Sequence, residues 1–328
     1  MKQSAEQRPI PSVQRKAAIA LGAALDHSGD VAVAPIPDFD LDRTIFQTLE
    51  KAAPRYVIKT RIAKTTAWDR PKAESVEAAY QAARTQYPLP TVDPALLRFM
   101  VDECDFDVEH ADGSFLDHLY FCFEYGVQHY PERSPLVLLL HSILGTGTNT
   151  FAMSADKIPT LRGLMNEFEW RHTEAFPSVL RLLYDLPLRK ELWANVERLD
   201  QLESIRMHRV IDNEPITLSA EDFFVQLNYQ LIHLVDFLPV ANWSTHQNDT
   251  SFIVFRDLYD LLQKAGKLEA KIDYEPAKPN KKQREAHTFG GWLTTLIPVR
   301  VSETMAAKSV RRFSERVGHS MEYTLTFK

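Results

Sequence analysis

The sequence has little of what defines several protein classes. Its 328 residues contain only two cysteines, Cys104 and Cys122, too few for a disulfide framework or a thiolate metal site. The longest apolar run, PLVLLLHSIL, is about half as long as a membrane-spanning helix requires. The first residues, MKQSAEQRPIPSVQRK, lack the apolar segment of a secretory signal. We therefore expect a cytoplasmic protein without a membrane span.

An excess of positive charge is also absent. The formal net charge is −6, and basic residues cluster only weakly, at KPNKKQR and VRRF. A nucleic-acid-binding surface needs a basic patch or stripe, so we expect no nucleic acid partner. A small molecule is the expected ligand, and association into a homo-oligomer remains open.

Glycine is scarce as well, with 11 residues in the chain. Apolar side chains recur at helical spacing over long stretches, and the 45% hydrophobic content is that of a globular protein. We predict an all-α fold in three parts. Residues 1–90 form an N-terminal extension that is partly helical, residues 91–265 form a helical core, and residues 266–328 form a linker and a C-terminal helix.

Helix-capping residues divide the predicted core. Asp156, Thr173 and Ser219 each stand where a side-chain oxygen can accept the first N–H groups of a helix. We expect core helices over residues 115–129, 135–145, 157–170, 174–186, 220–240 and 252–266.

Two histidines and an aspartate are the main candidates for chemistry. His118 lies one turn into its predicted helix, and His141 follows three consecutive leucines, so burial keeps its imidazole neutral and able to bind a metal. Asp236 shares a helix face with Tyr229 and His233. A carboxylate near a buried face needs a cation or several hydrogen bonds. His233 itself is interpreted as a core residue, as is His208.

The order of these residues resembles the HD superfamily, a group of helical metal-binding proteins. More narrowly, FLDHL followed by LLLHSILGTGTNTFAM is similar to an uncharacterised family of HD-like proteins. The similarity extends in order to about residue 240, which is about half of the chain. It implies an HD-like helical bundle in which His118, His141 and Asp236 coordinate a divalent metal, Mn, Fe or Mg.

One position departs from the family pattern. The metal-binding families have an aspartate after the second histidine, and this chain has Ser142. A hydroxyl is a poor ligand for a divalent ion, so the substitution argues against a two-metal site.

Two residues are candidates for catalysis. In several HD hydrolases an acidic residue between the histidine pair and the last aspartate is catalytic, and the resemblance gives that role to Glu174, with His172 beside it. Both lie near a predicted helix start, where the helix dipole stabilises an anion.

A further set of residues is expected to bind substrate. The loop GTGTNT offers hydroxyls, an amide and close backbone approach. The two arginines that flank His208 can clamp a phosphate or carboxylate. The set is Thr146, Thr148, Asn149, Arg206 and Arg209.

These residues indicate a metal-dependent hydrolase that acts on a small phosphorylated or polar metabolite. Two alternatives remain open. In the first alternative, the chain is a non-catalytic HD-like domain that binds a ligand or a protein. In the second, it is an iron-dependent oxygenase resembling the HD-fold inositol oxygenases. The last alternative normally needs a bridging aspartate, and Ser142 counts against it.

Overall fold

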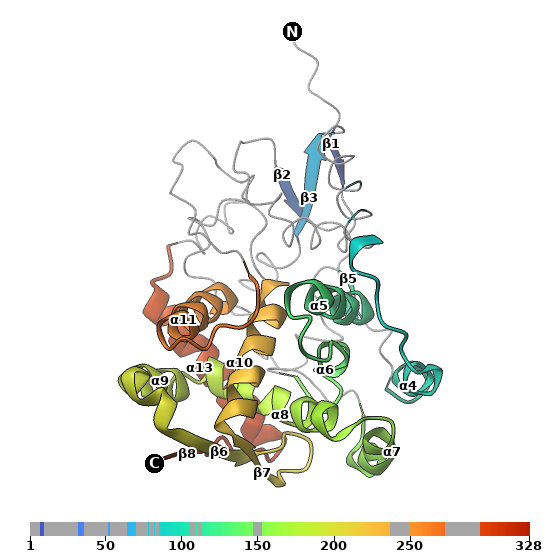
Figure 1. Ribbon diagram of the computed structural model, residues 1–328. Coiled ribbons are helices and arrows are strands. Elements are labelled where there is room, and N and C mark those ends of the chain that lie inside the picture. Colours follow the sequence, from blue (N-terminus) through green and yellow to red (C-terminus); the bar gives the residue numbers. More distant parts are fainter. Residues whose placement is uncertain are drawn as a thin grey trace.

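The computed structural model describes five long segments of the chain and several short pieces (Figure 1). The long segments are residues 85–104, 113–146, 153–236, 250–272 and 296–328. The short pieces include the strands β1 (Gln7–Pro9), β2 (Ala32–Pro35), β3 (Lys64–Asp69) and β4 (Glu109–His110).

In the N-terminal part, β3 pairs antiparallel with both β1 and β2. The helices expected within residues 1–90 fall largely outside the described residues. A second short pair joins β4 to β5 (Gly113–Ser114), directly before the first core helix.

The described part of the chain is mostly helical, as predicted. Helix α5 (Phe115–His129) covers the predicted range, and α10 (Ala220–Val235) begins after Ser219, whose hydroxyl accepts the Asp222 N–H at 3.1 Å. Helix α11 (Thr250–Lys264) is also confirmed. The remaining helices are α4 (Pro94–Arg98), α6 (Leu136–Leu140), α7 (Ile158–Gly163), α8 (Glu167–Tyr184), α9 (Pro187–Ala194) and α13 (Val299–Arg316).

The prediction of a helix through residue 145 was wrong. Helix α6 ends at Leu140, and a turn follows in which the N–H of Ile143 bonds to the carbonyl of Leu140 and that of Gly145 to Ser142. These bonds span three residues and tighten the chain into a turn. His141 therefore stands at a helix end and not within a helix.

The predicted helix start at Thr173 was also wrong. Helix α8 runs through it, because Asn166 and Glu169 form a reciprocal capping box at the beginning of the helix. Pro177 lies inside α8, where a proline ordinarily disfavours a helix. Most of the α8 side chains around Pro177 are buried, and this packing outweighs the lost hydrogen bond.

A three-stranded antiparallel sheet accompanies the helices, and the sequence analysis missed it. Its order is β7 (Pro215–Ser219), β6 (Leu202–His208) and β8 (Thr324–Phe327). The chain turns between β6 and β7 at Asn213, whose φ of 60° suits asparagine. Strand β8 brings the end of the chain beside the core, and the C-terminal helix α13 packs on α8 and α11.

Helix α10 lies at the centre of the helical body (Figure 1). Its residues from Phe223 to Val235 are all buried, and it packs against α5, α8, α11 and the sheet. A helix buried all round contributes side chains to the interior on every face. Polar residues on α10 are therefore held in fixed positions inside the protein.

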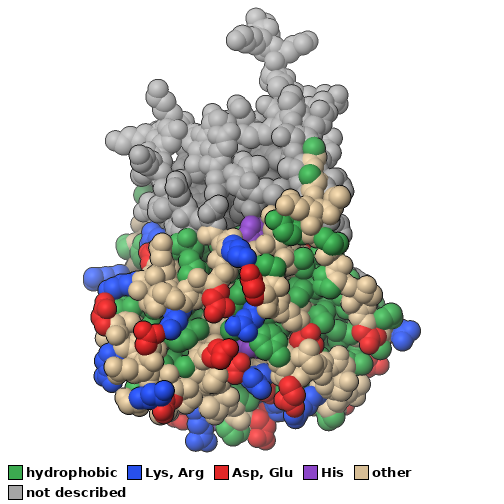
Figure 2. Space-filling model, viewed as in Figure 1, with side chains coloured by type: hydrophobic (Ala, Val, Ile, Leu, Met, Phe, Trp, Pro, Cys, Tyr) green, Lys and Arg blue, Asp and Glu red, His purple; other side chains and the backbone are tan. Residues whose placement is uncertain are grey.

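Neither the described helices nor the face of the protein shown in Figure 2 gives a sign of a membrane span or a basic patch. None of the helices within the described residues combines the length and the apolar character that a bilayer crossing needs. On the face shown in Figure 2, basic and acidic side chains are interspersed.

The close approach of α5 and α6 yields a first prediction. A Cβ added at Gly126 would lie 2.4 Å from the Cδ1 of buried Leu138. We expect Gly126→Ala to lower the free energy of unfolding by about 1–3 kcal/mol, although alanine favours a helix over glycine by about 1 kcal/mol. Gly163→Ala is the control, because no atom lies within 4 Å of its added Cβ. Equal stability of the two variants in urea denaturation would contradict this packing.

Candidate metal centre

Three buried histidines from separate segments meet beside α10. His118 comes from α5, His141 from the turn after α6 and His233 from the last turn of α10. Their residues are 1%, 1% and 5% exposed. One ring nitrogen from each lies within 4.8 Å of the other two. The predicted proximity of His118 and His141 is confirmed, since their Nε2 atoms are 3.0 Å apart.

The second nitrogen of two of these rings has a hydrogen-bond acceptor that fixes the tautomer. The Nδ1 of His141 lies 2.6 Å from the backbone oxygen of Leu138. The Nδ1 of His118 contacts the Oδ2 of Asp236. A carbonyl or carboxylate oxygen accepts only, so in the neutral rings both Nδ1 atoms carry the hydrogen. Both Nε2 atoms then present a lone pair.

The two Nε2 lone pairs point at each other across 3.0 Å. Two acceptors at this distance repel, and a cation between them turns the repulsion into attraction. That cation is a proton or a metal ion. Burial lowers the pKa of His141 to about 4, so its imidazole is neutral near pH 7 and suited to a metal.

The spacing of the His118 and His141 nitrogens fits a metal ion. Metal–nitrogen bonds of about 2.0–2.1 Å that meet at roughly 90–110° place two nitrogens about 2.9–3.4 Å apart. The observed 3.0 Å lies within this range. The most distant pair of the three nitrogens, at no more than 4.8 Å, needs to close by about 1–2 Å to join the same ion.

His233 was interpreted from the sequence as a core histidine, and the structure places it in the cluster. Its ring centroid is 5.2 Å from that of His118 and 4.6 Å from that of His141. The sequence held a signal for this position, because His233 lies one turn before Asp236 on the same face of α10.

Asp236 lies behind His118, on the side away from His141. Its carboxylate is 2% exposed and pairs with the Nδ1 of His118. In metal sites a carboxylate in this position orients the imidazole and makes it a stronger donor. The predicted role of Asp236 as a direct metal ligand stays a prediction, and its observed contact is that of an orienting partner.

The donor set discriminates among the expected metals. Three imidazole nitrogens suit Fe²⁺ and Zn²⁺, and also bind Mn²⁺, whereas Mg²⁺ takes oxygen ligands almost exclusively. Ser142 is buried beside His141 and offers a hydroxyl and not a carboxylate. The residues present fit one ion of the nitrogen-binding type.

His172, a predicted catalytic residue, lies on α8 outside the three-histidine cluster. Its Nδ1 is 3.0 Å from the Oε1 of Gln226, and its Nε2 is 3.5 Å from the Oδ1 of Asp222. Phe176, one turn later on α8, is the residue that packs on the cluster, with its ring centroid 4.9 Å from His141 and 5.4 Å from His233. His172 is thus one helical turn from the side chain that covers the imidazoles.

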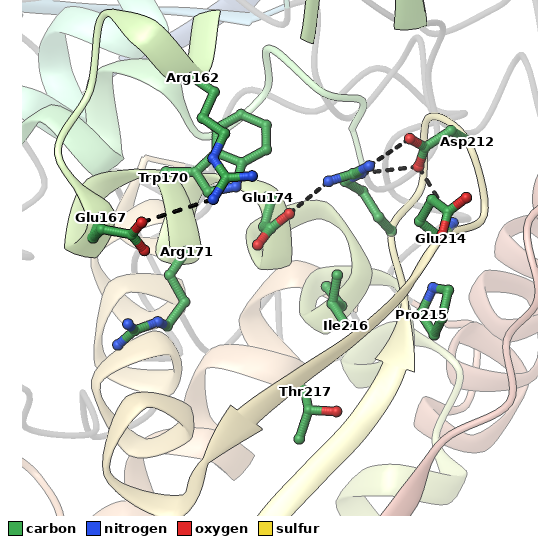
Figure 3. A pocket seen from close by; sticks show the side chains of 11 residues that line it. Arg162, Glu167, Trp170, Arg171, Glu174, Asp212, Glu214, Pro215, Ile216 and Thr217 are labelled. Carbon is green, nitrogen blue, oxygen red and sulfur yellow. Dashed lines mark hydrogen bonds and ion pairs between the residues drawn. The ribbon is translucent and has the colours of Figure 1, made fainter. Parts of the chain in front are cut away.

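Glu174, the other predicted catalytic residue, forms an ion pair with Arg209. The Nη1 of Arg209 lies 2.7 Å from its Oε2, and the Nη2 lies 2.5 Å from the Oδ2 of Asp212. These residues line an open cleft of about 630 Å³ (Figure 3). Because burial outweighs the effect of Arg209, the pKa of Glu174 is raised. Glu174 and Phe176 are two positions apart on α8, so their side chains point to nearly opposite sides of the helix.

The predicted substrate-binding residues are dispersed. Arg209 lines the cleft with its charge balanced by two carboxylates, whereas Arg206 is exposed on β6 and is not part of the cleft wall. Thr146 offers its backbone oxygen to the Nε of Arg181 at 2.9 Å. Thr148 and Asn149 lie outside the described residues. The structure thus shows no joint clamp by the two arginines.

Comparison with known proteins found no match to any family model, curated protein or solved structure.

Two other buried histidines, His172 and His319, should make the free energy of unfolding depend on pH. Burial lowers the pKa of His172 to about 4, opposed by Gln226 and Asp222 and assisted by Arg171 and Arg133. Burial and Arg181 lower the pKa of His319 to about 4, opposed by its hydrogen bond to the His208 carbonyl.

Below pH 6.5 the unfolded chain binds protons at these two positions and the folded chain does not, so stability falls from about pH 6.5 towards pH 4. We expect each histidine to contribute up to about 1 kcal/mol of loss per pH unit. Urea denaturation at pH 7, 6 and 5 measures the slope. His319→Gln keeps an acceptor for Arg181 and a donor for His208 and should flatten it. Identical slopes for this variant and the wild type would contradict the expected effect of burial.

Proposed function

We propose that the chain is a mononuclear metal-dependent hydrolase with an HD-like bundle, and that His118, His141 and His233 hold the ion. The observation that carries the proposal is the 3.0 Å approach of two imidazole nitrogens whose tautomers leave a lone pair on each. Three imidazoles with a remaining open position are typical of catalytic metal sites.

The protein's own groups would act in distinct ways. Asp236 holds the His118 ring by its Nδ1, and the Leu138 carbonyl holds the His141 ring in the same manner. Phe176 covers two of the rings and limits the access of water. A divalent ion bound there would lower the pKa of a coordinated water and polarise a substrate oxygen.

A small phosphorylated or polar metabolite remains the proposed substrate. Hydrolysis of such a molecule requires an ion with an open position and a nearby group to receive a proton. His172 is the proposed proton acceptor, because it lies on α8 one turn from Phe176, whose ring packs on the cluster. Glu174 is a less suitable acceptor, since its carboxylate is bound to Arg209.

A specific observation favours the non-catalytic alternative. The three histidines are at most 5% exposed, and the open cleft is lined by other residues. An ion in a closed site can stabilise the folded protein without any channel through which a substrate reaches it. The two-iron oxygenase is less well supported, because the cluster found among the described residues has three nitrogen donors and lacks the ligands for a second ion.

Metal analysis and assays on the same sample test the proposal. Elemental analysis of protein purified without added metal should give about one Fe, Mn or Zn per chain. Activity on p-nitrophenyl phosphate, bis-p-nitrophenyl phosphate and p-nitrophenyl acetate should appear with the metal and vanish with EDTA. His233→Ala should lose both metal and activity, whereas His172→Gln should keep the metal and lose activity.

The outcomes separate the alternatives. A bound metal with no activity on any ester would support the non-catalytic domain. Absence of metal, together with no uptake of Fe²⁺, Mn²⁺ or Zn²⁺ in calorimetric titration, would reject the metal centre. The 3.0 Å contact would then be a proton shared between two histidines.

A further inference from the structure

Among the residues that the structure describes, two arginines are buried, and their electrostatic surroundings are opposite. Arg189 is 4% exposed and binds Asp257 through Nη1 at 2.6 Å and Glu303 through Nη2 at 3.1 Å. Its Nε donates to the Leu183 carbonyl. Arg181 is 0% exposed, and no carboxylate forms an ion pair with it among the residues that the structure describes.

The partners of Arg181 are all neutral. Its Nε donates to the backbone oxygen of Thr146 at 2.9 Å, and its Nη1 lies 3.1 Å from the Ser314 hydroxyl and 3.3 Å from the Nδ1 of His319. The Nε2 of His319 donates to the His208 carbonyl at 3.0 Å, which leaves a lone pair on Nδ1 for the guanidinium. The remaining Nη2 is buried without an acceptor in the described part of the chain.

The contacts of Arg181 with neutral groups do not compensate for the free energy that burying its charge costs. The guanidinium carbon lies 4.7 Å from the ring centroid of Phe313. A cation–π contact of this kind stabilises a cation by less than the removal of its charge from water costs. Burial lowers the pKa of Arg181 to about 9, so the group still carries its charge near pH 7. An anion is the partner that this environment lacks.

The position of Arg181 connects it to the metal centre. The carbonyl that accepts from its Nε belongs to Thr146, five residues after His141. The same turn therefore carries a proposed metal ligand at its beginning and an Arg181 contact at its end. Arg181 itself lies on α8, five residues after Phe176, which covers the imidazoles.

We propose that Arg181 is an anion-recognition residue whose Nη2 donates to an oxyanion, a carboxylate or a phosphate, of the small-molecule ligand. The identification of that ligand with the substrate rests on the proposed function, and the binding of the anion does not. A guanidinium presents a planar set of N–H donors that matches both kinds of oxyanion.

Thermal melts of the full-length protein test the proposal without any metal. Phosphate and acetate are titrated separately in EDTA at constant ionic strength held with NaCl. One of them should raise the wild-type Tm saturably, by about 2–5 °C at tenfold excess over its dissociation constant. Phosphate acting alone identifies a phosphorylated ligand, and acetate acting alone identifies a carboxylate.

Variants locate the effect. Arg181→Gln should abolish the shift, and Arg181→Lys, which keeps the charge but not the planar donors, should reduce it. Arg189→Gln is the matched control, and its Tm should be lower throughout while the anion-dependent shift is retained. If Arg181→Gln does not fold, the lysine variant and isothermal titration of the wild type decide the question.

Several results would overturn the proposal. Wild-type protein that shows no saturable response to either anion rules it out, as does a shift of full size in both Arg181 variants. Metal uptake measured in the same samples keeps the two hypotheses apart. Weakened anion binding with normal metal content in Arg181→Lys supports the assignment, whereas absence of metal alone leaves it intact and removes only the proposed function.

Discussion

We expect His141→Ala to abolish the effect of metal on the stability of the protein. In the wild type, Fe²⁺, Mn²⁺ or Zn²⁺ at a hundredfold excess over its dissociation constant should add about 2.7 kcal/mol, which raises the Tm by about 4 °C for a chain of this length. Removing one of three proposed ligands should weaken metal affinity by at least about 100-fold, so the variant should melt at the same temperature with metal and with EDTA.

A second buried histidine provides the control for this prediction. His172 is 0% exposed and lies outside the three-histidine cluster. His172→Ala should destabilise the protein by about 1–3 kcal/mol through lost packing and a lost hydrogen bond, yet it should keep the full response to metal. A wild-type melt unchanged by metal and by EDTA would show that His141 is only a core residue.

The second large effect is expected at Arg189. This arginine joins α9 to α11 through Asp257 and to α13 through Glu303. Arg189→Met leaves two carboxylates without their cation and the Leu183 carbonyl without its donor. Breaking a buried ion pair on one side costs about 3–5 kcal/mol. Because Asp257 and Glu303 are partly exposed, we expect about 2–4 kcal/mol, measured by urea denaturation.

An exposed ion pair is the matched comparison. Lys264 lies 3.1 Å from Glu197, and both side chains are more than half exposed. Lys264→Met should change stability by no more than about 0.5 kcal/mol. If Arg189→Met lowered the free energy of unfolding as little as Lys264→Met does, Arg189 would stabilise the fold through its aliphatic stem, which methionine retains, and not through its charge.

The sequence predicted elements best where a local signal was strong. The bounds of α5 and the Ser219 cap of α10 followed from helical spacing and capping chemistry. The helix start expected at Thr173 failed because a threonine can cap a helix, whereas the actual cap is Asn166. Propensity at one residue was outweighed there by the burial of a whole helix face.

The sheet was missed because its strands are short and its third member is distant in the sequence. Strand β6 buries Leu202, Ile205 and Met207, but β8 pairs with it from residues 324–327. Pairing between segments so far apart leaves no local pattern in the sequence. The same limit applies to Arg181, whose surroundings come from α8, α13 and the turn at Thr146.

The candidate centre was predicted in part. The two histidines and Asp236 were identified by their order in the chain, and the structure brings them together. The contribution of His233 was not identified, because a single histidine in an apolar helix usually occupies the core. Only the packing of α5, α6 and α10 shows that its nitrogen approaches the other two.

The three histidines also determine when the site can form during folding. His118 and His141 are 23 residues apart in the sequence, and His233 belongs to a helix that follows only after the sheet hairpin. Contacts that close such long loops form late, after much of the chain entropy has been lost. An ion held by all three would stabilise the native state more than the transition state for folding. It should therefore slow unfolding many-fold and leave the refolding rate nearly unchanged.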